Sequence, residues 1–236
     1  MALAFAPPLY TVEEYLSYER AAEERHEYLD GYIYQMAGES GEHADICANL
    51  SGFLHSQLRG TSCRGRIANT KVRSGPLPLS PRSNKGLFSY PDVFVVCDPI
   101  QYHDEFRDIV INPVVIFEVL SPSTEDFDRD IKFERYDRWN PSLQDYLLVA
   151  QNVPKIEHYT HQADGSWRYR VYRGLEASFT IESIKCSLRL AEVYERVTSP
   201  PPPMPKLQTV PKKQPRTRKQ KPAAKTSSSQ QRSKKK

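Results

Sequence analysis

Apolar and polar positions in the first part of the chain follow a helical period, then a strand period, then a helical period again. Thr11-Val-Glu-Glu14 has the form of a capping box and predicts a helix through about residue 20. Alternation over 25–36 around Asp30-Gly31 predicts a hairpin. Helical spacing over 43–58 predicts a helix that ends before Gly60, with an inner face of Ile46, Leu50, Phe53, Leu54 and Leu58.

The second part of the chain is richer in strand signals. After a strand at 67–73 and a loop rich in Pro, Ser and Gly at 74–89, two strongly apolar strands are predicted at about 91–97 and 113–120. A helix over 124–139 and a strand at 143–150 follow, and this strand–helix–strand order implies a parallel pair. The last predicted elements are strands at 155–161, 166–173 and 178–184 and a short helix at 191–197. The predicted class is α/β (α+β), with a mixed central β-sheet flanked by helices.

Two acids stand at or within the two apolar strands. Asp92 follows Pro91 where the first strand begins, and Glu118 lies inside the second strand between Phe117 and Val119. An ionised acid in such surroundings is costly unless it is paired. If the two strands are neighbours, both acids can meet at one edge of the sheet, where Mg²⁺ or Mn²⁺ would pair with both, because these ions prefer oxygen ligands.

A lysine on the following predicted helix completes the candidate chemistry. Lys132 lies 14 residues after Glu118, and a helix that folds back over the sheet could return its ammonium to the same edge. There it would orient or deprotonate the attacking water or stabilise developing negative charge during phosphodiester hydrolysis. Simpler interpretations are a strand-start cap for Asp92, a buried arginine partner for Glu118 and an ordinary i, i+4 pair of Lys132 with Asp128.

A series of short motifs runs in one order along nearly all of the predicted globular part. They are Glu27-Tyr-Leu-Asp-Gly31, Met36-Ala37 followed by His43, Pro91-Asp92-Val93, Glu118-Val-Leu-Ser-Pro-Ser-Thr124, Asp128, Lys132, Tyr136 and Tyr146-Leu-Leu-Val149. Between about residue 10 and residue 197 the chain therefore resembles the Uma family of restriction endonucleases, a branch of the PD-(D/E)XK nuclease superfamily. Each motif alone would be weak evidence.

The resemblance implies a restriction-endonuclease-like core and Mg²⁺-dependent cleavage of nucleic acid, with DNA as the expected substrate. It implies that Asp92 and Glu118 are metal ligands and that Glu27 is an additional acid near the metal. The superfamily pattern has a lysine two residues after the second acid, where this chain has Leu120, so Lys132 is the expected substitute. Many small nucleases of this superfamily dimerise, which makes a homodimer one option.

Two other functions stay open at this point. One is a nucleic-acid-binding protein that retains the nuclease fold without cleaving, and the other is a phosphodiesterase acting on a nucleotide or RNA. For either binder or nuclease, basic residues before Asp92 are candidates for contacting phosphates, with a solvated charged loop as the alternative: Arg64, Arg66, Lys71, Arg73, Arg82 and Lys85.

Charge divides the chain into two parts. Residues 199–236 hold 12 Lys or Arg and no Asp or Glu, so residues 1–198 hold 21 basic and 29 acidic residues, a net charge of −8. The tail is also rich in Pro, Ser and Gln and almost free of apolar residues, which predicts disorder and affinity for polyanions. We therefore expect one domain over 1–198 and a disordered basic tail over 199–236. A solubilising tail without a specific partner is the alternative.

The remaining composition favours a cytoplasmic protein. Four scattered cysteines form no Cys-x-x-Cys pair and show no histidine at ligand spacing, so neither a zinc site nor a disulfide framework is expected. Residues 1–9 lack the features of a signal peptide, and no stretch has the length and apolarity of a membrane span.

Overall fold

The computed structural model describes residues 9–36, 38–67, 69–76 and 82–197. Its largest element is a six-stranded sheet in the order β11-β10-β9-β8-β6-β3. Among the described strands of this sheet only β8 and β9 are parallel, as the strand–helix–strand order predicts. The six strands are Trp167–Arg173, Lys155–His161, Asp145–Ala150, Pro113–Leu120, Val93–Cys97 and Cys63–Ile67.

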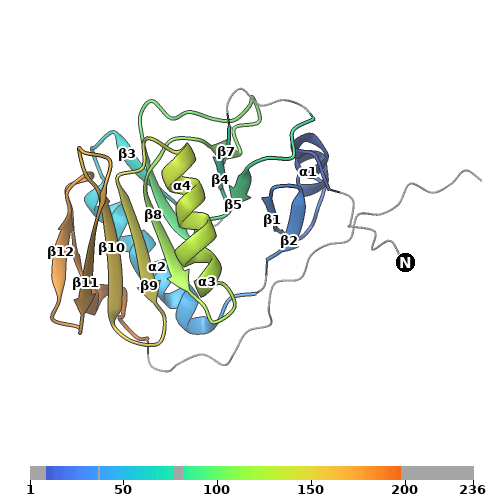
Figure 1. Cartoon of the computed structure of the whole chain (residues 1–236). Helices are drawn as coiled ribbons and strands as arrows, with labels where there is room; N and C mark the ends of the chain where they lie inside the picture. Colours follow the sequence, from blue (N-terminus) through green and yellow to red (C-terminus); the bar gives the residue numbers. More distant parts are fainter. Residues whose placement is uncertain (1–8, 37, 68, 77–81, 198–236) are drawn as a thin grey trace, which may run out of the picture.

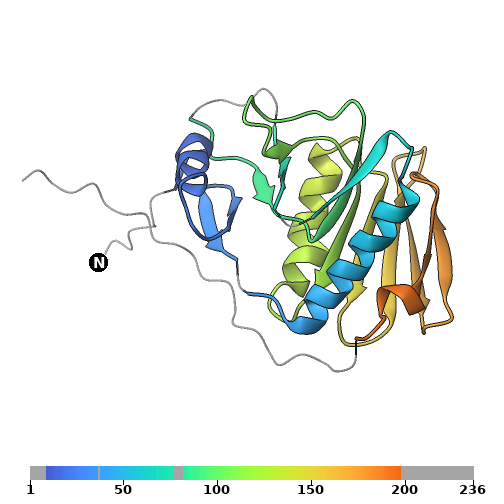
Figure 2. The ribbon, with the colours of Figure 1, turned by 180° about the vertical axis from the view of Figure 1, so that it is seen from behind.

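Helices cover both faces of the six-stranded sheet. Helix α2 (Gly41–Gln57) lies across one face, and α4 (Phe133–Trp139) lies across the other, as the two opposite views show (Figures 1 and 2). The short helix α3 (Glu125–Phe127) and a π-helical turn, η1 (Asp128–Lys132), lead into α4. None of the described helices is long and apolar enough to cross a membrane.

The alternation of β8 decides which side chains meet which helix. Val115, Phe117 and Val119 pack in the core beneath α2, whereas Ile116 and Leu120 pack with Tyr136 of α4. Successive side chains of a strand point to opposite faces. The side chain of Glu118 therefore projects to the α4 side of the sheet, as its contact with Tyr136 also shows.

A second sheet contains the hairpin, and the N-terminal helix α1 (Val12–Glu19) packs against it. Its five strands are ordered β2-β1-β5-β4-β7, and they span Tyr32–Gln35, His26–Leu29, Leu87–Ser89, Lys71–Ser74 and Ile109–Val110. A third, two-stranded sheet of β12 (Ser178–Ile181) and β13 (Cys186–Arg189) ends in α5 (Leu190–Val193). The side chains of this last unit complete the core under α2.

Most predicted elements are present. The capping box at Thr11, the hairpin turn at Asp30-Gly31 and the parallel pair are confirmed. The single strand predicted over 67–73 is wrong, because β3 and β4 belong to different sheets and the chain turns between them. Strands β5, β7 and β13 were not predicted. The predicted basic tail, 199–236, lies outside the described residues.

One disulfide departs from the expectation for the cysteines. Cys63 and Cys97 are direct partners on the antiparallel strands β3 and β6, and a disulfide joins them across a sequence separation of 34 residues. Cys47 and Cys186 are free. Only the strand register shows this pairing, because nothing in the spacing of the cysteines along the chain indicates that two of them are opposite one another.

Leucine truncation tests whether β9 forms the centre of the core. Leu147 is completely buried, whereas Leu175 is 48% exposed. We predict that Leu147→Ala lowers the free energy of unfolding by about 2–5 kcal/mol, and that the matched change Leu175→Ala lowers it by less than about 0.5 kcal/mol. Urea denaturation of both variants measures the difference. Equal losses would contradict the assigned packing.

Candidate functional site

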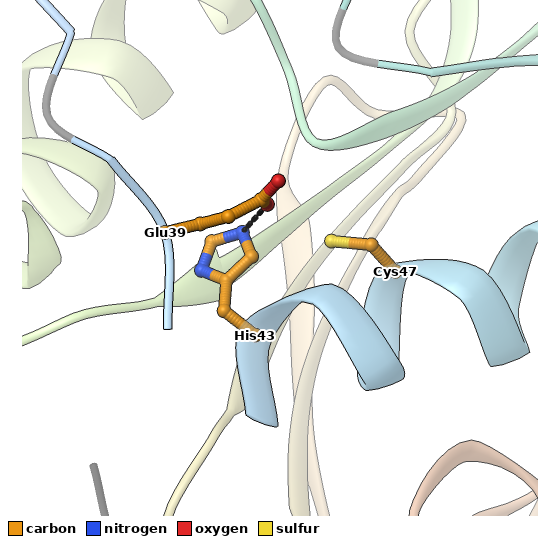
Figure 3. A group of neighbouring side chains, drawn as sticks. All are labelled: Glu39, His43 and Cys47. Atoms are coloured by element: carbon orange, nitrogen blue, oxygen red, sulfur yellow. Dashed lines mark ion pairs between the residues drawn. The ribbon is translucent and has the colours of Figure 1, made fainter. Parts of the chain in front are cut away.

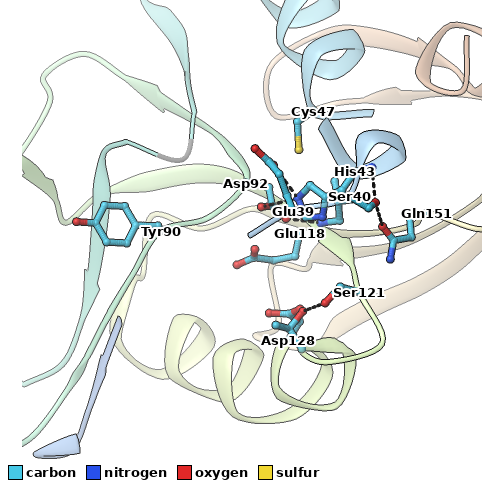
Figure 4. Close-up of polar contacts among 12 residues, drawn as sticks. Glu39, Ser40, His43, Cys47, Tyr90, Asp92, Glu118, Ser121, Asp128 and Gln151 are labelled. Carbon is cyan, nitrogen blue, oxygen red and sulfur yellow. Dashed lines mark hydrogen bonds and ion pairs between the residues drawn. The ribbon is translucent and has the colours of Figure 1, made fainter. Parts of the chain in front are cut away.

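The antiparallel pairing of β6 with β8 brings Asp92 beside Glu118. Val93 is paired with Phe117, so one further step in the register sets Asp92 opposite Glu118. The Oδ2 atom of Asp92 accepts a hydrogen bond of 2.7 Å from the backbone N–H of Val119. Both acids line one cavity of about 190 Å³ (Figure 4). The two strands that were expected to be neighbours are neighbours, and their acids open on one space.

Lys132 lies at the centre of a group of buried acids. Its Nζ atom is 3.0 Å from Oδ1 of Asp128, 3.3 Å from Oε1 of Glu27 and 3.5 Å from Oε1 of Glu118. All four side chains are at most 7% exposed. The i, i+4 pair with Asp128 therefore exists, and so does the expected return of the ammonium to Glu118. The two interpretations of Lys132 are compatible.

The π-helical turn η1 explains why both Asp128 and Lys132 point inward. Such turns are rare, and they often occur at functional sites. Asp128 and Lys132 are the two buried residues of this turn. The hydroxyl of Tyr146, on β9, donates a 2.7 Å hydrogen bond to the backbone carbonyl of Asp128. The widened turn is thus anchored to the sheet, and it delivers its acid and its lysine into the cavity.

Two further hydrogen bonds fix the other acids of this group. The hydroxyl of Tyr136 lies 2.8 Å from Oγ of Ser89 and donates to Oε1 of Glu118 at 3.2 Å. Glu27, on β1, accepts a 3.1 Å hydrogen bond from the backbone N–H of Tyr90. Glu27 is 5% exposed, so it faces the interior between the two larger sheets. The three acids and the lysine predicted from the sequence, Glu27, Asp92, Glu118 and Lys132, all line one cavity.

His43 approaches Asp92 from the other side of the cavity. Ser40 caps α2 by accepting a hydrogen bond from the backbone N–H of His43, which places this side chain in the first turn. Its Nε2 atom is 3.0 Å from Oδ1 of Asp92. Burial alone lowers the pKa of His43, but the carboxylates of Asp92 and Glu39 raise it above its ordinary value. His43 is therefore a hydrogen-bonding partner of Asp92, and its protonated form is favoured there.

The site as a whole has more negative than positive charge. Five carboxylates line the cavity, those of Glu27, Glu39, Asp92, Glu118 and Asp128, against the side chains of Arg25, His43 and Lys132. Burial raises the pKa of Glu118 well above its ordinary value, and the charges of Asp128, Asp92 and Glu27 add to this rise against the opposing effect of Lys132. A hard divalent cation would offset this excess, and oxygen is the ligand atom that such ions prefer. The donor set fits Mg²⁺ or Mn²⁺.

A second group of possible metal ligands was missed in the sequence. One ligand atom each from Glu39, His43 and Cys47 lies within 4.8 Å of the others (Figure 3). The expectation that no histidine stands at ligand spacing from a cysteine is wrong. His43 and Cys47 are four residues apart, which is one turn of α2, and that spacing was the available signal.

Of the six basic residues expected to contact phosphates, two are buried and Arg66 is partly buried, whereas Arg64, Arg82 and Lys85 are exposed. Lys71 and Arg73 are buried in β4, where Lys71 pairs with Asp108 at 3.3 Å and Arg73 donates to the carbonyl of Pro76. These two residues cannot face a duplex. The exposed side chains of Arg64 and Lys85 are paired with Asp98 and Asp30.

Comparisons with known proteins show the family of this chain. A family model described as "Uma2: Putative restriction endonuclease" matches residues 12–191. Two proteins of Synechocystis sp., slr1290 and sll1609, are 35% and 30% identical, over 79% and 78% of this chain and 92% and 99% of their own lengths. Both carry names that assign no function.

A solved structure has the same fold. It is titled a putative nuclease belonging to DUF820 from Anabaena variabilis, and the match covers 80% of this chain and 99% of that one, with a TM-score of 0.62 at 18% identity. The two chains therefore share a fold of mixed sheets flanked by helices. The chain belongs to the Uma2 family, whose model spans most of its described residues.

Two glutamates with opposite pKa shifts provide a test of the electrostatics. Since the pKa of Glu118 in the folded protein is raised above 4.5, the folded state holds this proton to higher pH than the unfolded chain does. Stability attributable to Glu118 therefore falls as the pH rises above about 4.5. We predict that Glu118→Gln is more stable than wild type at pH 7 and that this gain disappears below pH 4.5.

Glu157→Gln is the matched control. The hydrogen bond from Arg129 lowers the pKa of Glu157 to about 2, so its stabilising contribution is present above pH 4.5 and is lost as the pH falls toward 2. This variant should be less stable than wild type at pH 7. Thermal unfolding between pH 3 and pH 7 measures both, and a loss of stability in Glu118→Gln at pH 7 would contradict the charge excess.

Proposed function

We propose that the protein is a metal-dependent endonuclease that hydrolyses phosphodiester bonds in nucleic acid, with DNA as its substrate. The observation that carries the proposal is the convergence of Asp92, Glu118 and Lys132 on one cavity between two sheets. Membership of a family described as a putative restriction endonuclease supports the same reaction class.

Asp92 and Glu118 are the proposed metal ligands. Asp92 is held by the N–H of Val119 and is 16% exposed on its side chain, so it forms the rim of the site, whereas Glu118 forms the floor. When bound, Mg²⁺ or Mn²⁺ would supply a water of lowered pKa and a positive charge against the phosphate. Glu27 is the proposed additional acid, and it contributes by holding Lys132 in place.

Lys132 is the proposed source of positive charge from the protein itself. Burial alone lowers its pKa, but Asp128, Glu118 and Glu27 raise it well above the ordinary value. A lysine that keeps its proton at neutral pH cannot accept one from water, so of the roles considered above we retain charge stabilisation. The ammonium would donate a hydrogen bond to a phosphate oxygen while the water oxygen bonds to phosphorus and the bond to the leaving sugar oxygen breaks. The proton of the attacking water would pass to solvent, and the leaving oxygen would take one from solvent.

Substitution of the two acids tests the enzymatic proposal. We predict that Asp92→Ala and Glu118→Ala each lower Mg²⁺-dependent cleavage of plasmid DNA by more than about 100-fold, because loss of a direct ligand should exceed the 10- to 100-fold effect of an outer partner. Asp98→Asn, an exposed acid directly after β6, is the control and should retain activity. Gel analysis of nicking and linearisation with Mg²⁺ or Mn²⁺ is the measurement.

The same assay separates the alternatives. Cleavage that is equal in wild type and Asp92→Ala, or absent from both, would overturn the proposal. DNA binding without any cleavage would instead support a non-cleaving protein that retains the fold. Cleavage of RNA or of a small phosphodiester, but not of DNA, would support the third function considered above.

We also propose that residues 1–198 form the catalytic domain and that residues 199–236 add salt-dependent affinity for DNA. The 12 Lys and Arg of the tail are the basis, since each neutralised phosphate steepens the dependence of binding on salt by about 0.9 in a log–log plot for duplex DNA.

Removal of the tail tests this division. In an Asp92→Ala background, truncation after Val197 should weaken DNA binding and make its salt dependence shallower, because fewer phosphates are neutralised. A full-length variant with all 12 tail Lys and Arg changed to Gln is the control for length and should behave like the truncation. Fluorescence anisotropy at several salt concentrations measures both. An unchanged slope would assign DNA affinity to the folded domain.

A further inference from the structure

A mixed set of sulfur, nitrogen and oxygen ligands lies at one wall of the oxygen-rich cavity, which Glu39 and His43 also line. His43 and Cys47 stand one turn apart on α2, and Glu39 directly precedes the N-cap residue Ser40. Their ligand atoms all lie within 4.8 Å of one another. In Figure 3 the sulfur of Cys47 is directed toward the His43 ring and the Glu39 carboxylate. We propose that these three residues form a second metal site, selective for a thiophilic divalent cation such as Zn²⁺.

Solvent reaches this site from one side, because its three ligands differ in exposure. The side chain of Glu39 is 54% exposed, whereas that of His43 is 11% exposed. Cys47 is partly buried. A cation can therefore reach the group from solvent past Glu39, which is an exposed acid at the mouth. His43 and Cys47 stand on a regular helix whose N-terminus is capped, so they are held in place before any ion arrives.

The ligand types separate this site from the one at Asp92 and Glu118. Thiolate and imidazole ligands favour Zn²⁺ and related ions, whereas Mg²⁺ favours carboxylates, carbonyls and water. Three protein ligands leave a fourth position for water, as is usual in exchangeable or reactive zinc sites. Cys47 would bind the ion as a thiolate, so binding releases the thiol proton to solvent.

One nitrogen atom links the two sites. Nε2 of His43 is 3.0 Å from Oδ1 of Asp92 and 3.7 Å from Oε2 of Glu39. This nitrogen cannot donate a hydrogen bond to Asp92 while its lone pair binds a cation. Occupation of the second site therefore removes the histidine partner of Asp92. Any resulting change in cleavage rests on the proposed function, whereas the binding of the ion does not.

Spectroscopy of the full-length protein with Co²⁺ as the probe tests the binding directly. We expect Co²⁺, added without reductant, to produce a thiolate-to-cobalt charge-transfer band, and Zn²⁺ to abolish it at one equivalent while excess Mg²⁺ leaves it intact. The band should be absent from Cys47→Ser and present in Cys186→Ser, which removes the other free cysteine. Glu39→Gln changes an exposed side chain, and it should weaken Zn²⁺ binding by at least about 10-fold in a chelator competition.

Each contrary result overturns the proposal. A band that persists in Cys47→Ser would assign the sulfur ligand elsewhere, and a band that never appears in wild type would show that no thiolate site forms. Unchanged Zn²⁺ affinity in Glu39→Gln would remove the third ligand, and with it the site proposed. These readouts need no DNA, so they remain interpretable whether or not the protein cleaves.

Discussion

Charge compensation around Lys132 is the constraint on which the site depends. Three carboxylates lie within 3.5 Å of its buried ammonium, and they come from β1, β8 and the π turn before α4. Removal of the lysine would leave three buried carboxylates without a compensating positive charge, which is usually strongly destabilising. The same contacts that hold the five-stranded sheet against the six-stranded sheet therefore also set the charge of the cavity. The side chains that stabilise the packing of the two sheets are therefore also those proposed to act in catalysis.

The fold places Lys132 and its acids beside a cavity, near the end of strand β8, and not in a sealed core. β8 is buried along almost its whole length, and Glu118 is the one acidic residue in it. Its pairing with β6 ends next to Asp92, where the sheet opens on the cavity. The wall on one side is the start of α2, with His43, and on the other side it is the π turn (Figure 4). Glu118, which would be costly to bury alone in an apolar strand, is thus paired with Lys132 and Tyr136, and it lines a cavity.

Elements that are determined by local sequence could be predicted from the sequence. Features that depend on which strands become neighbours could not. The capping box at Thr11 and the apolar run of β8 each carry their own signal, and both were predicted correctly. The split of 67–73 into β3 and β4, and the disulfide between Cys63 and Cys97, depend on which strands become neighbours, and a single chain does not show that. The burial of Lys71 has the same origin, since its partner Asp108 is distant in sequence. For Cys47 the signal was present in the helical spacing to His43 but was overlooked.

The central claim is that Asp92 and Glu118 grip one shared cation, and anomalous diffraction from crystals of the full-length protein soaked in Mn²⁺ tests it most directly. We predict an anomalous peak about 2 Å from a carboxylate oxygen of each residue, the distance typical of a hard divalent ion and its oxygen ligands. A cavity without any peak, or manganese bound solely among Glu39, His43 and Cys47, would contradict it.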